Sequence, residues 1–253
     1  MKQSIPPGLS SKETGGDPRL PIYQRLRDEF ARLIATQAWR PGEAIPAELT
    51  LAAEHEVAPG TVRRAIEALV GEGLLVRRQG RGTFVRRADF TTSLFRFFRF
   101  HGAGGERRVP ESRILTIEQR PAPAEVAEKL LLAEGAEAIQ LSRLRLFDGT
   151  AFLFEEIWLP HDAFAPLLDL APDEFGDLLY PLYERLCGKV IASATESLAA
   201  EAAEERYARA LRLVPGTPVI VIERLALGYD FVPLEWRRSR GPADRFRYQV
   251  EIR

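Results

Sequence analysis

The sequence VAPGTVRRAIEALVGEGLLVRRQGRGTFVRR, residues 57–87, decides the fold of the first part of the chain. It holds seven arginines and two glutamates, whereas the whole chain of 253 residues has a formal net charge of -1. From position 61 onward, apolar residues recur at three- and four-residue intervals, which predicts an amphipathic helix. Its inward stripe comprises Val62, Ala65, Ile66, Leu69 and Val70, and its outer face comprises Thr61, Arg63, Arg64, Glu67 and Ala68. Beyond this helix, alternation around Gln79-Gly80-Arg81-Gly82 predicts a two-stranded hairpin.

Two further helices are expected before this stretch. Apolar residues recur at helical spacing over LPIYQRLRDEFARLIATQAW, residues 20–39. PAELTLAAEHEV, residues 46–57, predicts a second, short helix with Leu49, Leu51 and Ala52 turned inward. Three helices followed by a hairpin describe a winged helix-turn-helix, a fold whose third helix enters the major groove of DNA.

The outer arginines of the third helix and of the hairpin are candidate DNA contacts. Thr61, Arg63 and Arg64 stand at the N-terminal end of the helix, where a recognition helix meets base edges. Arg81 at the hairpin tip is placed to reach a phosphate or the minor groove. The alternative is a solvated surface on which Arg63 and Glu67 form an i,i+4 ion pair.

Charge divides the chain into a basic part and an acidic part. Residues 20–87 contain eleven arginines and eight acidic residues, whereas residues 88–253 contain 21 Lys or Arg and 26 Asp or Glu. A polyanionic partner is therefore expected to meet only the first part. The expected organisation is a disordered leader over 1–19, a DNA-binding domain over 20–87, a linker over 88–111 and a second domain over 112–253.

Composition excludes several classes of protein. No apolar run approaches the roughly 20 residues that span a bilayer, so no membrane segment is expected. The first nineteen residues lack the apolar segment of a secretory signal. The one cysteine, Cys187, has no partner for a disulfide within the chain, which favours a cytoplasmic protein.

The first domain resembles the GntR-type bacterial transcription regulators. The matching residues are Pro21-Ile22-Tyr23, Pro41-Gly42, Pro46, Glu48, Thr61-Val62-Arg63, Glu72-Gly73-Leu74-Leu75, Arg77, Gly80, Gly82 and Thr83-Phe84-Val85. The resemblance implies DNA contacts from Thr61 and Arg63, with Gln79 and Gly80 of the wing beside them. Many relatives have an arginine where Leu49 stands, and a Ser-Arg or Thr-Arg pair in place of Ala58-Pro59. Arg64 and Arg81 are the candidates to replace those contacts.

The second domain is α+β by pattern, with a mostly antiparallel sheet. Strands are predicted over 112–120, 138–147, 151–160 and 189–201, at two places within 218–240 around a Gly228 turn, and over 245–253. Helices are predicted over 121–132, 175–188 and 201–213. Asp148-Gly149 predicts a tight turn between two of the strands.

This domain resembles the UTRA effector-sensing domain of the HutC-like branch of GntR regulators, a fold similar to chorismate lyase. Its landmarks are Arg143-Leu144-Arg145, Asp148-Gly149, Glu155, Trp158-Leu159-Pro160, Pro233-Leu234-Glu235-Trp236, Arg238-Ser239 and Asp244-Arg245. The resemblance implies a ligand cavity and a homodimer formed through these domains. A two-fold protein would match a palindromic operator.

A paired-arginine strand is the candidate effector site. Arg143 and Arg145 are two residues apart, so they project from one face of a strand, where two guanidiniums can grip a carboxylate or phosphate. Glu155 and Glu235 are candidates to accept from hydroxyl or amine groups of the same ligand. The alternative is that both acids neutralise the arginines in a structural network. Ser93, in the linker, stands near where some relatives place a hydroxyl that touches the effector.

The hypothesis that the protein is an enzyme has little support in the sequence. The histidines His55, His101 and His161 are scattered and lack metal-ligand spacing, and no phosphate loop or nucleophile elbow accompanies them. We therefore expect no catalytic residues, metal or cofactor, and a repressor released from its operator by a small anionic metabolite. A DNA-binding regulator without an effector and a chorismate-lyase-like enzyme are the alternatives.

Overall fold

The structure is a computed structural model that describes residues 19–87 and 109–246. The chain divides into two compact units at the boundary between Arg87 and Ala88, and each is described by itself. The expected leader before residue 19, most of the expected linker, Ser93 and the greater part of the last predicted strand lie outside the described residues.

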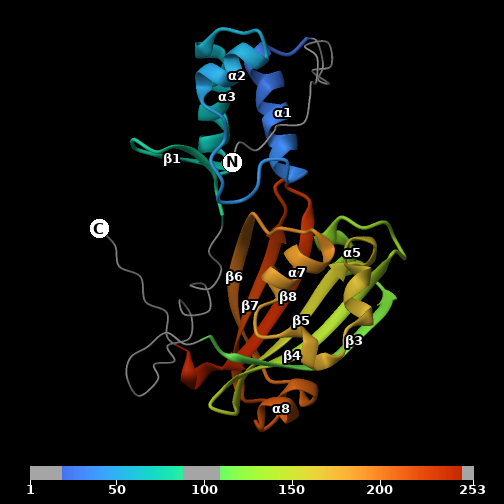
Figure 1. The fold of residues 1–253 in the computed structure, drawn as a ribbon. Helices are drawn as coiled ribbons and strands as arrows, with labels where there is room; N and C mark the ends of the chain where they lie inside the picture. The colour runs from blue at the N-terminus through green and yellow to red at the C-terminus, as the bar shows by residue number, and fades with distance from the viewer. Residues whose placement is uncertain (1–18, 88–108, 247–253) are drawn as a thin grey trace. The chain divides into compact units, whose positions relative to one another are not determined.

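The first unit consists of three helices and a hairpin, which confirms the predicted winged helix-turn-helix (Figure 1). The elements are α1 (Ile22–Ala35), α2 (Glu48–Glu54), α3 (Pro59–Gly71), β1 (Leu75–Arg78) and β2 (Gly82–Val85). The helices pack through buried side chains that include Leu26, Phe30, Ile34, Leu51, Val62, Ile66 and Leu69. β1 and β2 pair antiparallel, and Gly80 and Gly82 take the positive φ angles that close the wing.

The expectation that Leu49 turns inward is wrong. Its side chain is 72% exposed, whereas Leu51 is 1% exposed and Ala52 is 6% exposed. Residues two positions apart on a helix point in nearly opposite directions, so Leu49 and Leu51 cannot both face the core. Val70, expected in the inward stripe, is half-buried. α3 also begins earlier than position 61, with Ala58 as its N-cap residue.

The second unit is built on one six-stranded sheet. Its strands are β3 (Glu111–Pro121), β4 (Glu137–Phe147), β5 (Thr150–Pro160), β6 (Ser193–Ala202), β7 (Pro218–Leu227) and β8 (Pro233–Pro242). They lie in the order β3-β4-β5-β8-β7-β6, and every neighbouring pair is antiparallel. The predicted Asp148-Gly149 turn joins β4 to β5, and both residues have positive φ angles.

Helices cover both faces of this sheet. They are α5 (Ala124–Leu130), α6 (His161–Phe164), α7 (Leu179–Cys187) and α8 (Glu205–Leu211), with short 3-10 turns η1 (Ala165–Asp169), η2 (Pro172–Phe175) and η3 (Ala243–Arg245). The last strand was predicted to begin at Arg245. In the structure, Arg245 is instead the last residue of the 3-10 turn η3.

The two faces carry different helices because alternate residues of each strand point to opposite sides. Ile139 and Leu141 of β4 pack with α6, η1, η2 and α7. Leu144 and Leu146 of the same strand pack with α8, while α5 covers the tryptophans of β5 and β8. Arg143 and Arg145 share the parity of Ile139 and Leu141, so they lie on the face that α7 helps to cover.

We expect unequal effects from the two leucines of α2. Leu51→Ala should lower the free energy of unfolding of the first unit by about 2 to 5 kcal/mol, because it leaves a cavity in the core. Leu49→Ala should change it by less than about 0.5 kcal/mol, because the side chain is exposed. Denaturant unfolding of the full chain, followed by circular dichroism, measures both. A larger loss from Leu49→Ala would contradict the observed orientation of α2.

Candidate functional site

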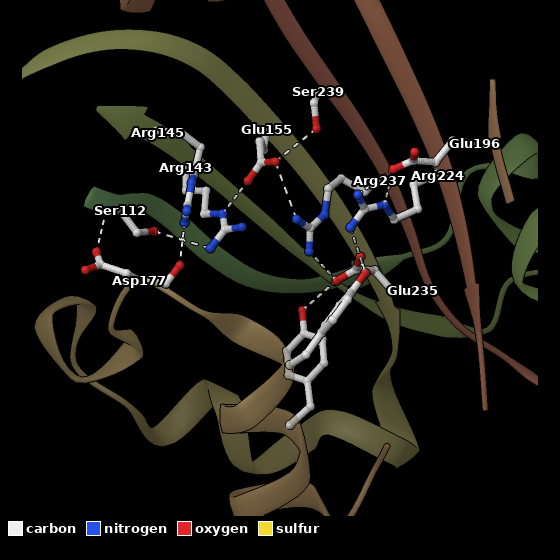
Figure 2. A network of polar contacts seen from close by, with 12 residues as sticks. Ser112, Arg143, Arg145, Glu155, Asp177, Glu196, Arg224, Glu235, Arg237 and Ser239 are labelled. Carbon is white, nitrogen blue, oxygen red and sulfur yellow. Dashed lines mark hydrogen bonds and ion pairs between the residues drawn. The ribbon is translucent and has the colours of Figure 1, made fainter. Parts of the chain in front are cut away.

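A buried row of charged and polar side chains crosses the face of the sheet beside α7 (Figure 2). Arg143 on β4 lies opposite Glu155 on β5, which in turn lies opposite Ser239 on β8. Arg143 Nε donates to Glu155 Oε2 at 2.5 Å, and Ser239 Oγ donates to Glu155 Oε1 at 2.9 Å. Arg237 of β8 reaches the same carboxylate at 3.4 Å. Although burial opposes ionisation, the charges of Arg143 and Arg237 hold the pKa of Glu155 well below its usual range.

The second acid of the row is held by two tyrosines and an arginine. Glu235 accepts from Tyr180 at 3.0 Å, from Tyr183 at 2.9 Å and from Arg237 at 2.7 Å. Burial, together with the charge of Glu235, raises the pKa of Tyr180 to about 12 and the pKa of Tyr183 well above its usual range. Both phenols therefore stay protonated and act as donors at neutral pH.

The row continues to the edge of the sheet. Arg224 of β7 lies opposite Glu196 of the edge strand β6, and its Nε donates to that carboxylate at 2.7 Å. Its Nη1 also contacts the hydroxyl oxygen of Tyr180 at 3.2 Å. Arg224 also lies opposite Arg237 of β8. These two like charges are paired with separate acids, Glu196 and Glu235. Charged side chains thus extend from β4 to β6 on one face.

Arg145 is the exception in this row. Its side chain is fully buried, and its Nη1 donates to the carbonyl oxygen of Asp177, between η2 and α7. Its Nε and Nη2 have no hydrogen-bond partner, and among the described residues no other side chain has two such atoms. Burial, and then the charge of Arg143, lowers the pKa of Arg145 to about 9. The guanidinium is still charged at neutral pH, so a positive charge lies buried with three of its five N–H donors, those of Nε and Nη2, unused.

The segment between η2 and α7 closes over this arginine. Asp177 Oδ1 accepts from the backbone N–H of Ser112 on β3 at 2.7 Å. Ser112 Oγ in turn accepts from Arg143 Nη1 at 3.3 Å. Asp177 therefore links the edge strand β3 to Arg145. The side chain of Ser112 links the same strand to Arg143.

Four of the five predicted effector residues lie in this row. Arg143, Arg145, Glu155 and Glu235 are all buried on one face, and Ser93 lies outside the described residues. Glu155 contacts Arg143 directly, as the structural alternative predicted, whereas Arg237 connects Glu235 to Glu155.

The sequence interpretation did not propose the other residues of the row as site residues, although Ser239 was among the family landmarks. These other residues are Ser112, Asp177, Tyr180, Tyr183, Glu196, Arg224, Arg237 and Ser239. One signal was present in EWRRSR, because Glu235, Arg237 and Ser239 are each two apart and share a face of β8. The two tyrosines reach the row from α7, and Asp177 reaches it from the segment before α7. No spacing within a strand marks these residues in the sequence.

A pocket on the opposite face does not coincide with the charged row. It has a volume of about 100 Å³ and lies between α5 and the strands β5 and β8. Its lining residues are Pro123, Glu125, Val126, Glu156, Trp158, Trp236 and Arg238. The charged groups there are paired, Arg238 with Glu125 and Glu156 with Arg206. One buried donor in the pocket, Trp236 Nε1, has no hydrogen-bond partner, whereas Arg145 has two such nitrogens on a charged group. The buried charge therefore favours Arg145 over this pocket as the candidate site for an anion.

The candidate DNA contacts lie on α3 and the wing. Arg63 and Arg64 are exposed on α3 close to Thr61, and Gln79, Gly80 and Arg81 form the exposed turn between β1 and β2. Arg63 pairs with Glu48 of α2 at 2.9 Å rather than with Glu67, which contacts Arg77 at 3.7 Å. The guanidinium of Arg64 lies 4.0 Å from the ring centroid of Tyr23 on α1.

Two further features are absent from the described ranges 19–87 and 109–246. No group of three or more histidine, cysteine or acidic side chains there is arranged to hold a metal ion. No helix in that part of the chain is long and apolar enough to cross a membrane.

Comparison with known proteins agrees with both units. Residues 22–85 match the gntR family of bacterial regulatory proteins, and residues 105–247 match the UTRA domain. The chain is 26% identical to the HTH-type transcriptional repressor NagR of Bacillus subtilis, over 90% of this chain and 93% of NagR. It is 25% identical to a fructoselysine utilization operon transcriptional repressor of Escherichia coli, over 84% and 87% of the two chains.

A solved structure has the same fold as the second unit. The ligand-binding domain of a GntR-family regulator from Bordetella bronchiseptica aligns with a TM-score of 0.55 and 29% identity, covering 66% of this chain and 99% of that domain. The matching families and the named relatives are transcription regulators rather than enzymes. The chain belongs to the GntR family of bacterial transcription regulators and carries a UTRA domain.

Proposed function

We propose that this regulator is a repressor that leaves its operator when a small anionic metabolite binds to Arg145. The observation that carries the proposal is the buried guanidinium whose Nε and Nη2 lack partners. These two N–H groups lie on the same edge of the planar guanidinium, and this edge forms the two parallel hydrogen bonds that carboxylates and phosphates accept. A buried donor pair of this kind is costly unless an acceptor reaches it.

The charges around Arg145 indicate the class of ligand. Arg143 and Arg237 form ion pairs with the carboxylates of Glu155 and Glu235. The nearest acid to Arg145 is Asp177, whose carboxylate binds the backbone N–H of Ser112 rather than the guanidinium. The buried charge of Arg145 therefore has no ion-pair partner among the described residues. A carboxylate or phosphate group at Arg145 would balance it. Hydroxyl or amine groups on the same molecule would be recognised by Glu235 and by the phenols that now contact it.

The relatives suggest which anions to test. One relative is named for fructoselysine utilization, and another from Escherichia coli, 26% identical over 91% of this chain, is named for mannosyl-D-glycerate transport and metabolism. Sugar derivatives that carry a carboxylate or a phosphate are therefore the first panel of candidate effectors for this chain.

DNA recognition is proposed for the first unit through Thr61, Arg63 and Arg64 of α3 and through the wing residues Gln79, Gly80 and Arg81. One winged helix reads a single half-site, so we propose a homodimer on a palindromic operator. The effector would release the operator by binding more tightly to the free protein than to the operator-bound protein. A coupling free energy of about 1 to 3 kcal/mol would weaken operator binding roughly 5- to 150-fold.

The first test concerns DNA. Upstream duplexes selected by the purified protein should contain an inverted repeat, and log affinity should fall with log salt concentration by roughly 0.9 per phosphate neutralised. Arg63→Ala should cost about 1 to 3 kcal/mol on the selected duplex and relax the preference at one base pair. Light scattering should give twice the chain mass of 28.4 kDa. Binding that shows no sequence preference at any salt concentration would refute the proposal.

The second test concerns the effector. Arg145→Met should abolish release of the selected duplex by the active anion while leaving duplex affinity without the anion unchanged, because the methionine cannot donate. Arg209→Met, at an exposed site on α8, is the matched control and should respond as the unaltered protein does. Fluorescence anisotropy of the labelled duplex measures both. If Arg145→Met still released the duplex at the same anion concentration, the effector would bind elsewhere.

The third test separates binding from structural support. Glu155→Ala should lower the free energy of unfolding by about 3 to 5 kcal/mol, because Arg143 and Arg237 lose their buried partner. The pKa of Glu155 is lowered by folding, so its contribution is present at neutral pH and diminishes as pH falls below about 4.5. Arg145→Met without ligand should leave stability unchanged or raise it by about 1 kcal/mol, because a partly unpaired charge is removed.

Denaturant unfolding at several pH values measures these differences. A loss of several kcal/mol from Arg145→Met would show that this arginine is a structural member of the row. Glu205→Ala, at an exposed ion pair of α8, is the control that should leave stability unchanged.

A further inference from the structure

A single carboxylate joins three elements of the DNA-binding unit. Glu48 is the first residue of α2, and both of its oxygens are engaged. Oε2 accepts from Nε of Arg63 on α3 at 2.9 Å, and Oε1 accepts from Nη2 of Arg77 on β1 at 3.1 Å. The recognition helix and the wing are therefore both tied to the start of α2 at one point.

The burial of these groups shows which of them is set back from the surface. The side chain of Glu48 is 25% exposed, whereas those of Arg63 and Arg77 are 60% and 43% exposed. The carboxylate holds Arg63 through Nε, which leaves the Nη groups at the outer end of the guanidinium available to donate. That end carries the two parallel donors that match the O6 and N7 acceptors of guanine.

A negative charge at this place is not explained by affinity for DNA. The phosphate backbone attracts cations, so an acid among the arginines of a DNA-binding surface weakens binding to any sequence. A gain in specificity for one DNA sequence would offset this loss of general affinity. Holding a long, flexible arginine in one orientation provides it, because less side-chain freedom is lost when the base contact forms.

We propose that Glu48 is a positioning residue that orients Arg63 and fixes the wing through Arg77, and that it contributes specificity for the operator at the expense of general affinity for DNA. The inference rests on the proposed function, in which Arg63 contacts a base. It assigns a role to an acid that does not itself touch the duplex.

The test uses Glu48→Gln in the full chain. A glutamine has one acceptor oxygen in place of two, so at least one of the two arginines loses its partner. Affinity is measured for the duplex selected by the unaltered protein and for a scrambled duplex of equal length and composition. Affinity for the selected duplex should fall on the order of fivefold or more, while affinity for the scrambled duplex should not fall.

Glu54→Gln is the matched control, because it removes one negative charge from the other end of the same helix, at an exposed position. It should leave the ratio of the two affinities unchanged. Thermal unfolding of both variants accompanies the binding data. If Glu48→Gln weakened binding to both duplexes equally and lowered the unfolding temperature, Glu48 would be structural. If it strengthened binding to both equally, the acid would only repel DNA. Either result overturns the inference.

Arg63→Ala separates the base contact of Arg63 from the positioning role of Glu48. With Arg63 absent, Glu48→Gln should cause no further loss of specificity, because the group that it orients is gone. If Arg63→Ala relaxes specificity and Glu48→Gln does not, the positioning role is wrong and the base contact stands. If Arg63→Ala leaves specificity intact, the proposed base contact is itself wrong.

Discussion

The second unit depends on keeping a row of charges paired beneath a helical cover. Removing a charged group from water costs several kcal/mol, and the cost is offset only when a partner of opposite charge and good geometry is present. Glu155 and Glu235 each meet an arginine, and the tyrosines of α7 complete the pairing of Glu235. Arg145 has no acid in direct contact, and two of its three nitrogens have no hydrogen-bond partner. A buried guanidinium without an ion-pair partner, beside arginines that have one, supports the proposed anion site.

Local sequence signals were enough for much of the fold and for part of the site. The period-two spacing of Arg143 and Arg145 placed them on one face, and Asp148-Gly149 joined their strand to the next. The glycines of the wing and the helical spacing before it predicted the winged helix-turn-helix. Each of these signals lies within a few residues along the chain, where the periodicity of a helix or strand determines which side chains are neighbours.

The residues that sequence reasoning missed reach the site from distant parts of the chain. β5 pairs with β8 rather than with its successor, and this brings Arg237 and Ser239 to Glu155. The main-chain carbonyl of Asp177 contacts Arg145 and carries no sequence signal at all. Leu49 was placed inward because apolar residues were counted along α2 without their angles around the helix. Tertiary pairing and helix orientation are the information that a local pattern lacks.

In the proposed function, Arg145 holds an anion through Nε and Nη2. Diffraction from a crystal of the full chain grown with selenate, a doubly charged oxyanion, tests it directly through the anomalous signal of selenium. We expect a selenium peak one Se–O bond beyond hydrogen-bonding distance from those two nitrogens, so that selenate oxygens accept from both, with Ser112 and Asp177 beside it. A saturated crystal with no peak at Arg145, or with a peak only in the pocket beside Arg238, would contradict the account.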